Sequence, residues 1–307
     1  MNLVFFGMSG PLARGALEAL LSARLVPRAI VTPALAGGPI FTMSRLTGST
    51  HSVGRHPLPS LTPLAQTGLA ALASAHAIPL LEIGSARAIG THDAIRAFET
   101  DVIAVACFPW RLPEALLAMP RLGCVNLHPS LLPENRGPDP LFWTFRHGDT
   151  RTGVTVHLMT AELDAGPILR QTAIPVEDGL SETVLERRCA ETGGRLLVEA
   201  VAGLVAGREP TPVPQDERGA TYYGQPSALD YVIESDWSAR RCENFTRGVI
   251  GRGQPVLIHV NGVTYRIVEP LGVVEDELAS NDASMLTNGI VTLRRRTGVW
   301  RARVAPL

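Results

Sequence analysis

Lysine is absent from this chain, and all 28 of its basic residues are arginines. This absence excludes a lysine that forms a Schiff base with a carbonyl substrate, and it excludes the lysine of a phosphate-binding P-loop. The acidic residues number 29, so the formal net charge is −1. Because phosphate contacts dominate nucleic-acid affinity, a nucleic-acid binder is expected to have a basic surface, which this overall balance does not indicate.

Long apolar runs and clustered cysteines are missing as well. No stretch reaches about 18 apolar residues, the length that a membrane-spanning helix needs. Residues 1–7 lack the basic start and the cleavage site of a signal peptide, and their apolar character favours a first β-strand. The four cysteines are widely spaced and suggest neither a disulfide framework nor a metal site. We expect a cytoplasmic protein with no bound metal and no membrane association, and we take a monomer as the default.

The most informative segment begins at a short alternating run, residues 124–128. If this run is a strand, Asn126 and His128 point to the same face of it. Pro129 ends the strand and restricts His128 to extended conformations. Both polar side chains then lie at the carboxyl end of a strand, which is the edge where open α/β sheets bind ligands.

A second strand is predicted over residues 153–159, which alternate and are rich in β-branched side chains. Thr155 and His157 share one face of it, and His157 is interpreted as a structural hydrogen-bonding group. The turn that begins at Asp164 is able to return a carboxylate to the edge that carries Asn126 and His128.

An amide, an imidazole and a carboxylate at neighbouring strand ends are the groups needed to transfer an acyl unit to an amine. The Asn126 amide can donate to the oxyanion of a tetrahedral intermediate, which is typically worth ~3–4 kcal/mol of barrier. His128 can accept a proton from the amine or hold the oxyanion as imidazolium, and Asp164 can orient His128 and pass protons through a water. Each residue taken singly is equally consistent with a turn or a structural group, so the combination carries the interpretation.

The same residues carry a resemblance to the folate-dependent formyltransferase family. Three motifs match in order and spacing: Asn-x-His-x-Ser-Leu-Leu-Pro-x-x-Arg-Gly, Thr-Gly-Val-Thr-x-His and Asp-x-Gly-x-Ile. The matching residues are Asn126, His128, Ser130, Leu131, Leu132, Pro133, Arg136, Gly137, Thr152, Gly153, Val154, Thr155, Asp164, Gly166 and Ile168. The resemblance implies 10-formyltetrahydrofolate as the formyl donor and Asn126, His128 and Asp164 as the catalytic residues.

The resemblance also implies where the folate binds. The residues that would surround it are Phe108, Pro109, Trp110, Arg111, Leu112, Ser130, Arg136, Gly137 and Leu163. Two alternatives remain open for this set. The aromatic and apolar residues at 108–112 are also typical of core packing at a strand–helix turn, and Arg136-Gly137 is equally consistent with a surface turn.

The periodicity along the chain predicts an α/β fold with a Rossmann-like, mostly parallel sheet and helices on both faces. Residues 1–206 form the expected catalytic domain, and the Pro-rich stretch 207–220 is the expected linker. Within the first domain, the pair Gly193-Gly194 is a candidate break in a long helix over 181–206. Strand-like runs follow over residues 221–307, and the resemblance implies a small C-terminal β-barrel of the OB type.

Three readings of the function follow, in this order of preference. The first acceptor is methionyl-tRNA, which the extra β domain favours. The second is a small amine such as an amino sugar nucleotide, which the charge favours, because residues 206–307 hold 12 Arg and 12 Asp or Glu.

The expected long loop at 34–62 is the place where methionyl-tRNA enzymes carry a basic insertion. In this chain it holds only Arg45 and Arg55 with two histidines. The cluster Arg294–Arg296 can meet a phosphate or simply protect an edge strand. The third reading is a non-catalytic or hydrolytic folate-binding relative.

Overall fold

The computed structural model describes residues 1–34, 41–44, 68–208, 211–274, 283–295 and 298–307. Each of two compact units draws on three stretches of the chain. Unit 1 comprises residues 1–136, 153–173 and 186–221, and unit 2 comprises residues 137–152, 174–185 and 222–307. The boundaries inferred from the sequence, with a linker at 207–220, stay a prediction.

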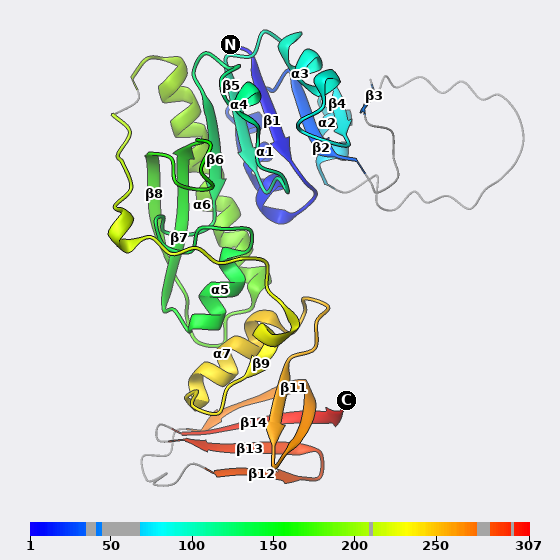
Figure 1. Ribbon diagram of the computed structural model, residues 1–307, viewed down its shortest axis with the longest axis vertical. Helices are drawn as coiled ribbons and strands as arrows, with labels where there is room; N and C mark the ends of the chain where they lie inside the picture. The colour runs from blue at the N-terminus through cyan, green and yellow to red at the C-terminus, as the bar shows by residue number, and fades with distance from the viewer. Residues whose placement is uncertain (35–40, 45–67, 209–210, 275–282, 296–297) are drawn as a thin grey trace, which may run out of the picture. The chain divides into compact units, whose positions relative to one another are not determined.

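Unit 1 is built on an eight-stranded sheet with the order β3-β4-β2-β1-β5-β6-β7-β8 (Figure 1). The five central strands, from β4 to β6, are parallel, whereas β3 and β7 pair antiparallel with their neighbours β4 and β6. The predicted Rossmann-like sheet is therefore confirmed. The strands in chain order are β1 (Leu3–Gly7), β2 (Ala29–Pro33), β3 (Phe41–Ser44), β4 (Leu80–Ile83), β5 (Val102–Ala106), β6 (Cys124–His128), β7 (Arg151–Leu158) and β8 (Ile168–Pro175).

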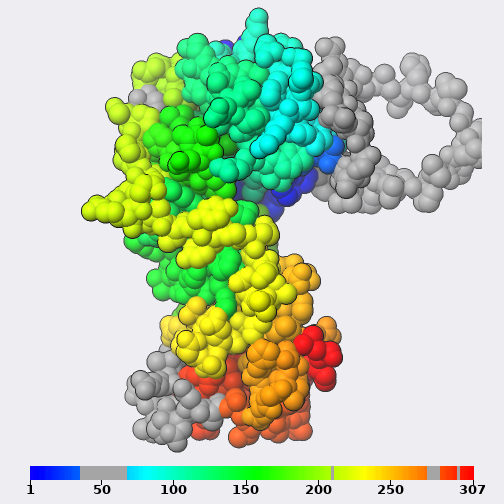
Figure 2. All heavy atoms as spheres, in the orientation of Figure 1, coloured from blue at the N-terminus to red at the C-terminus, as the bar shows by residue number. Residues whose placement is uncertain are grey.

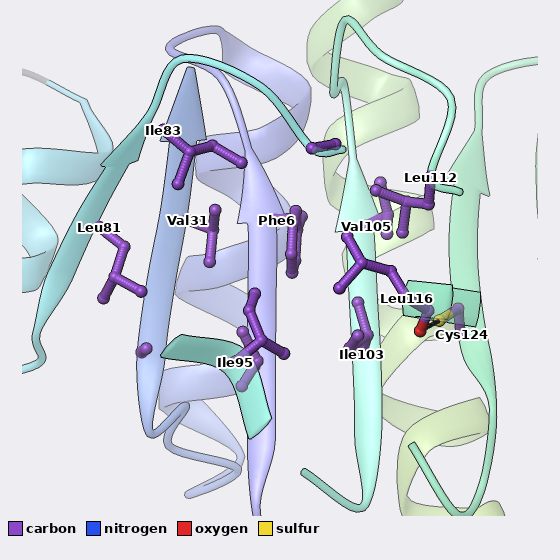
Figure 3. Packing of buried hydrophobic residues seen from close by; sticks show 13 residues of the cluster. Phe6, Val31, Leu81, Ile83, Ile95, Ile103, Val105, Leu112, Leu116 and Cys124 are labelled. Atoms are coloured by element: carbon purple, nitrogen blue, oxygen red, sulfur yellow. Dashed lines mark hydrogen bonds between the residues drawn. The ribbon is translucent and has the colours of Figure 1, made fainter. Parts of the chain in front are cut away.

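Short helices cover one face of this sheet over a continuous apolar core. Ile95 from α3 (Ile89–Arg96) and Leu116 from α4 (Glu114–Leu117) are fully buried against side chains of the central strands, as Figure 3 shows. Those strand side chains include Phe6, Val31 and Ile103. The strands read as nearly continuous apolar runs because helices bury both of their faces.

On the other face lie α1 (Pro11–Ser22) and the long helix α6 (Glu182–Val205), and α2 (Leu69–Ala75) contacts α1. The candidate break in α6 at Gly193-Gly194 was wrong, since the helix is continuous. A Cβ on Gly193 would lie 2.7 Å from Leu127 of β6, and a Cβ on Gly194 would lie 2.8 Å from Ala19 of α1. The two glycines therefore let α6 approach the sheet and α1 closely, and packing outweighs their low helix propensity.

Two strands of unit 1, β3 and β4, lie where no strand was expected. The four residues of β4 are too few to show a period. The four residues of β3 fall inside the expected loop at 34–62 and pair antiparallel with β4 as an edge strand. The other residues of that expected loop, apart from residue 34, lie outside the described residues. Among the described residues, no helix is long and apolar enough to cross a membrane.

Unit 2 carries a second sheet of six strands with the order β12-β13-β14-β11-β10-β9, which confirms the small C-terminal β domain. Asn261 and Gly262 join β10 to β11 with φ angles of 51° and 79°, as a two-residue hairpin turn with positive φ at both positions requires. Pro270 lies within β11, where two bulges accommodate it. The elements of this unit are α5 (Pro140–His147), η2 (Ala228–Tyr231), β9 (Val232–Ile233), α7 (Ala239–Val249), β10 (Leu257–Val260), β11 (Val263–Val274), β12 (Ala283–Thr287), β13 (Ile290–Arg295) and β14 (Gly298–Pro306).

Candidate active site

The carboxyl end of β6 presents Asn126 and His128 on the same face, as the alternation of the sequence predicts. The antiparallel neighbour β7 places His157 directly opposite Asn126, and Thr155 directly opposite His128. His128 and His157 are 4% and 1% exposed, whereas Asn126 is half-buried. Two neighbouring strands therefore deliver a pair of imidazoles and an amide to one edge of the sheet.

Asp164 lies in the turn between β7 and β8 and points back to that edge. Its Oδ1 atom is 3.7 Å from His128 Nδ1 and 3.5 Å from Asn126 Nδ2. The carboxylate is buried, with 7% exposure. The fold thus brings together the three side chains that the sequence nominates, although they are separated by up to 38 residues along the chain.

The hydrogen bonds of His128 define which of its nitrogen atoms is available for chemistry. His128 Nε2 lies 2.9 Å from the carbonyl oxygen of Asn135, and only a protonated nitrogen can donate to that oxygen. In neutral His128 the lone pair is therefore on Nδ1, the atom that faces Asp164. A proton taken up at Nδ1 would lie against the Asp164 carboxylate.

His157 fixes the orientation of the Asn126 amide. Its Nδ1 donates to the carbonyl oxygen of Leu158 at 2.9 Å, so its Nε2 accepts from Asn126 Nδ2 at 3.1 Å. Burial lowers the pKa of His157 from 6.5 to about 4, although the nearby Asp164 carboxylate opposes this shift. His157 is consequently a neutral acceptor at physiological pH, and it determines which end of the Asn126 amide faces the site.

The lowered pKa of His157 predicts a stability change with pH. In the unfolded chain this histidine takes up a proton near its ordinary pKa of 6.5, whereas in the folded chain it does so only near pH 4. Above pH 6.5 His157 is neutral in both states, and the free energy of unfolding is at its full value. As the pH falls from 6.5 toward 4, protonation of the unfolded chain lowers the free energy of unfolding, by roughly 3 kcal/mol for a pKa shift of this size. We expect His157→Gln, which keeps an acceptor for Asn126 but cannot titrate, to flatten the fall in unfolding free energy over this window in urea titrations. A variant that retains the wild-type slope would show that another group causes the fall.

The structure brings three of the expected folate-site residues, Arg111, Leu112 and Leu163, to the edge of the Asn126–His128–Asp164 cluster. Arg111, Leu112, Leu163 and Asp164 line a cavity of about 20 Å³ together with His157. Arg111 Nη2 also donates to the carbonyl oxygen of Ala161 at 2.7 Å and so links the loop after β5 to the loop that carries Asp164.

The aromatic residues of the same expected set pack partly into the core. Phe108 makes edge-to-face contacts with Phe6 and with Trp110, at centroid distances of 5.2 and 5.5 Å. Pro109 is exposed beside them. These aromatic rings therefore form an apolar wall that is anchored in the core of unit 1.

Ser130, Arg136 and Gly137 occupy the loop after β6 and differ in what they contact. The Ser130 hydroxyl is buried and donates to the carbonyl oxygen of Glu134 at 2.7 Å. The Arg136 guanidinium binds the side chains of Gln215 and Glu217. Gly137 belongs to unit 2, where its φ of 121° and its approach to the Tyr223 carbonyl leave no room for a Cβ. The role of these three residues in folate binding stays a prediction.

Sequence reasoning missed one residue of this region, Gln215. Its amide nitrogen donates to the carbonyl oxygens of Asp164 and Gly166, each at 2.7 Å. No local pattern marks it, because it lies in an irregular Pro-rich stretch about 50 residues from its partners. Among the described residues, no group of three or more His, Cys, Asp or Glu side chains is placed to hold a metal ion.

The segment that carries these residues matches a known protein family. A family profile described as formyl transferase matches residues 74–201. The chain is 39% identical to the methionyl-tRNA formyltransferase of Synechococcus sp. over 177 residues. This aligned stretch covers 57% of this chain and 55% of that protein. It is 34% identical over 235 residues to the methionyl-tRNA formyltransferase of Aromatoleum aromaticum, covering 76% of this chain and 67% of that protein. The chain thus spans only about half the length of the first of these relatives.

A solved structure extends the likeness over nearly the whole chain. The N-formyltransferase from Helicobacter canadensis, in complex with folinic acid and dTDP-3-aminofucose, superposes with a TM-score of 0.65 over 99% of both chains. The sequence identity is 13%, so this likeness concerns the fold alone.

Proposed function

This chain belongs to the formyl transferase family, and we propose that it transfers a formyl group from 10-formyltetrahydrofolate to the amino group of methionyl-tRNA. The observation that carries the proposal is the convergence of Asn126, His128 and Asp164 at the carboxyl end of β6. The curated relatives are named methionyl-tRNA formyltransferases, which supports methionyl-tRNA as the acceptor. A tRNA substrate is also consistent with the expected cytoplasmic location.

The proposed mechanism assigns one task to each side chain. 10-Formyltetrahydrofolate supplies the formyl carbon, and attack by the amine builds negative charge on the formyl oxygen. Asn126 Nδ2 donates one hydrogen to His157 Nε2 at 3.1 Å and the other to Asp164 Oδ1 at 3.5 Å. The second hydrogen bond is at the limit of length, so this hydrogen can turn to the formyl oxygen as negative charge develops there. His128 Nδ1 accepts the proton that the amine loses as its bond to the formyl carbon forms. The Asp164 carboxylate then stabilises the resulting imidazolium until the proton passes to the departing nitrogen of the folate.

The chemistry of the neighbouring loops suits a folate, although their spacing does not yet accommodate one. Leu112 and Leu163 offer apolar surface beside the proposed catalytic cluster, and Arg111 offers a cation. The cavity among them is about 20 Å³, whereas small-molecule pockets are typically about 300 Å³ or larger. Binding of the pteridine would therefore separate the loops that the Arg111–Ala161 hydrogen bond holds together.

The C-terminal sheet offers a surface that suits a phosphate backbone. Arg301 and Arg303 are exposed on β14, where they alternate with buried residues. Arg294 of β13 and Arg266 of β11 are exposed on the same face, according to the register of the three strands. Among the described residues of this face, Glu269 lies directly opposite Arg303 and forms an ion pair with it at 3.4 Å. A local basic face therefore exists although residues 206–307 are formally neutral, and this supports an RNA acceptor.

The test of the function is formyl transfer from 10-formyltetrahydrofolate to initiator methionyl-tRNA by the purified protein. Efficient transfer that weakens with added salt would support the proposal. Transfer to an amino sugar nucleotide but not to the tRNA would replace the acceptor and keep the chemistry. Folate binding with no transfer to either amine would favour a non-catalytic or hydrolytic relative.

Substitution of arginines on the basic face should weaken binding of the tRNA in a salt-dependent way and leave folate binding unchanged. We expect the double variant Arg301→Gln/Arg303→Gln to raise KM for the tRNA by about tenfold and to reduce the slope of log affinity against log salt by roughly 1–2. KM for the folate should not change, because the substitutions lie in unit 2. Arg96→Gln, at an arginine of α3 that is also exposed, is the control. An equal effect of both substitutions would show that the basic face plays no specific part.

A further inference from the structure

Residues 213–221, here called the strap, run back across unit 1 and contact both the Asp164 turn and the loop that follows β6. Figures 1 and 2 show the strap in yellow where it crosses the green strands of unit 1. At its start, the backbone of Val213 exchanges two hydrogen bonds with Ile168, at 2.8 and 2.9 Å. At its end, Thr221 donates its backbone N–H to the carbonyl oxygen of Pro133 at 3.1 Å.

Gln215 lies between these two ends and uses both halves of its amide. Nε2 donates to the carbonyl oxygens of Asp164 and Gly166, each at 2.7 Å, while Oε1 accepts from Arg136 Nη2 at 2.8 Å and from Nε at 3.2 Å. A flipped amide would set oxygen against two carbonyls and nitrogen against a guanidinium, so only this orientation satisfies every group. One side chain therefore joins the Asp164 turn to the loop after β6.

The strap also holds the loop after β6 on the side of His128. Arg136 is 8% exposed and forms a two-pronged ion pair with Glu217, at 2.7 and 3.0 Å. The Thr221 hydroxyl accepts the N–H of Asn135 at 2.8 Å, and the carbonyl of the same Asn135 receives the His128 Nε2 hydrogen bond. Asp164 thus contacts the strap directly through its carbonyl oxygen, and His128 is connected to the strap through Asn135.

The backbone of Asp164 needs such support. Its φ angle is 54°, in the left-handed region that residues other than glycine rarely adopt. Such a conformation costs of order 1–3 kcal/mol and persists only when surrounding contacts enforce it. The two hydrogen bonds from Gln215 fall on the carbonyl of this residue and on that of Gly166, where a Cβ would lie 1.7 Å from the Leu158 carbonyl oxygen.

We infer that Gln215 is a positioning residue for formyl transfer: it holds the Asp164 turn against the loop after β6 and so sets the 3.7 Å separation between Asp164 Oδ1 and His128 Nδ1. The inference rests on the proposed function. Because a misplacement of about 1 Å can cost about 100-fold in rate, loss of this contact should act on turnover more than on binding.

Two substitutions at Gln215 test the inference with purified full-length protein. Gln215→Met keeps the volume and removes every hydrogen bond, and we expect kcat to fall by about 100-fold with KM for 10-formyltetrahydrofolate within about threefold of wild type. Gln215→Glu keeps the acceptor for Arg136, loses both donors and sets a carboxylate against two carbonyls, so its kcat should be no higher. Arg218→Gln is the matched control, since that side chain is 90% exposed and pairs with Asp216 of the strap itself. A wild-type kcat in Gln215→Met would overturn the inference.

A double-mutant cycle separates positioning from general weakening of the fold. If Gln215 acts through Asp164, Gln215→Met should change the residual rate of Asp164→Asn by less than about threefold, because residues that act as a unit are not additive. A second loss of about 100-fold in that background would show that Gln215 acts independently of Asp164, and it would overturn the inference.

Amide hydrogen exchange gives a readout that does not depend on catalysis. Gln215→Met should accelerate exchange across residues 161–167 relative to wild type and to Arg218→Gln, since it frees the Asp164 turn. Unchanged exchange would overturn the inference even if the protein formylates none of the acceptors tested. A wild-type protein that transfers no formyl group would instead contradict the proposed function, and the exchange experiment would still decide the role of Gln215.

Discussion

Asp164→Asn is expected to lower kcat for formyl transfer by about 10³–10⁴-fold while leaving the fold intact. The substitution preserves the shape of the side chain and removes its charge. The proton that His128 Nδ1 accepts would then lose the carboxylate 3.7 Å away that stabilises it. The new amide would also set a donor or a weaker acceptor against Asn126 Nδ2, which lies 3.5 Å from Oδ1. Single-turnover transfer to the acceptor measures the rate, and thermal unfolding measures the fold.

The same chemical change at a neighbouring position gives the control for this experiment. Glu162 is exposed on the same turn, so Glu162→Gln also converts a carboxylate to an amide but outside the catalytic cluster. It should retain nearly the wild-type rate. Comparable losses in both variants would mean that the net charge of the turn, and not the Asp164 carboxylate, controls transfer.

Asn126→Ala should lower kcat by about 10²–10³-fold, the usual cost of removing one oxyanion donor. KM for the folate should change little, because the hydrogen bond is strong only when negative charge develops on the formyl oxygen. Thermal unfolding is again needed, since the substitution also leaves His157 Nε2 without the donor that lies 3.1 Å from it. Steady-state kinetics over a range of folate concentrations separate kcat from KM.

Asn126→Asp distinguishes the donor role from simple packing. This variant nearly preserves the volume of the side chain but replaces the donor by a carboxylate next to Asp164, so it should be no more active than Asn126→Ala. Substantial activity in Asn126→Asp would show that volume, and not hydrogen-bond donation, is what the site requires. A wild-type rate in Asn126→Ala would remove this residue from the mechanism altogether.

The placement of Asn126 and His128 in the proposed catalytic cluster follows from local sequence. The alternation over β6 determines that Asn126 and His128 share a face, and Pro129 determines that the strand ends there. The hairpin turn at Asn261-Gly262 likewise depends on two residues, because that pair adopts positive φ easily. Such predictions succeed where one or two residues constrain the backbone directly.

Other features depend on contacts between distant parts of the chain and leave no local signal. The pair Gly193-Gly194 indicates a break by propensity alone, and only the close approach of Leu127 and Ala19 explains an unbroken helix. β4 is stabilised by pairing with β2 and β3 and not by a pattern of its own. Gln215 lies in an irregular stretch whose conformation is set by loops 49 to 79 residues away.

The position of Gln215 constrains how this catalytic unit can be recombined with other C-terminal domains. A chimaera joined at residue 207 would import the partner's strap, and with it whatever side chain stands where Gln215 does. A chimaera joined after Thr221 would keep the native strap and exchange only the last part of unit 2, which also includes residues 137–152 and 174–185. If Gln215 positions the Asp164 turn as inferred, an exchange of C-terminal sequence keeps the Gln215 hydrogen bonds to that turn only when the junction falls after Thr221.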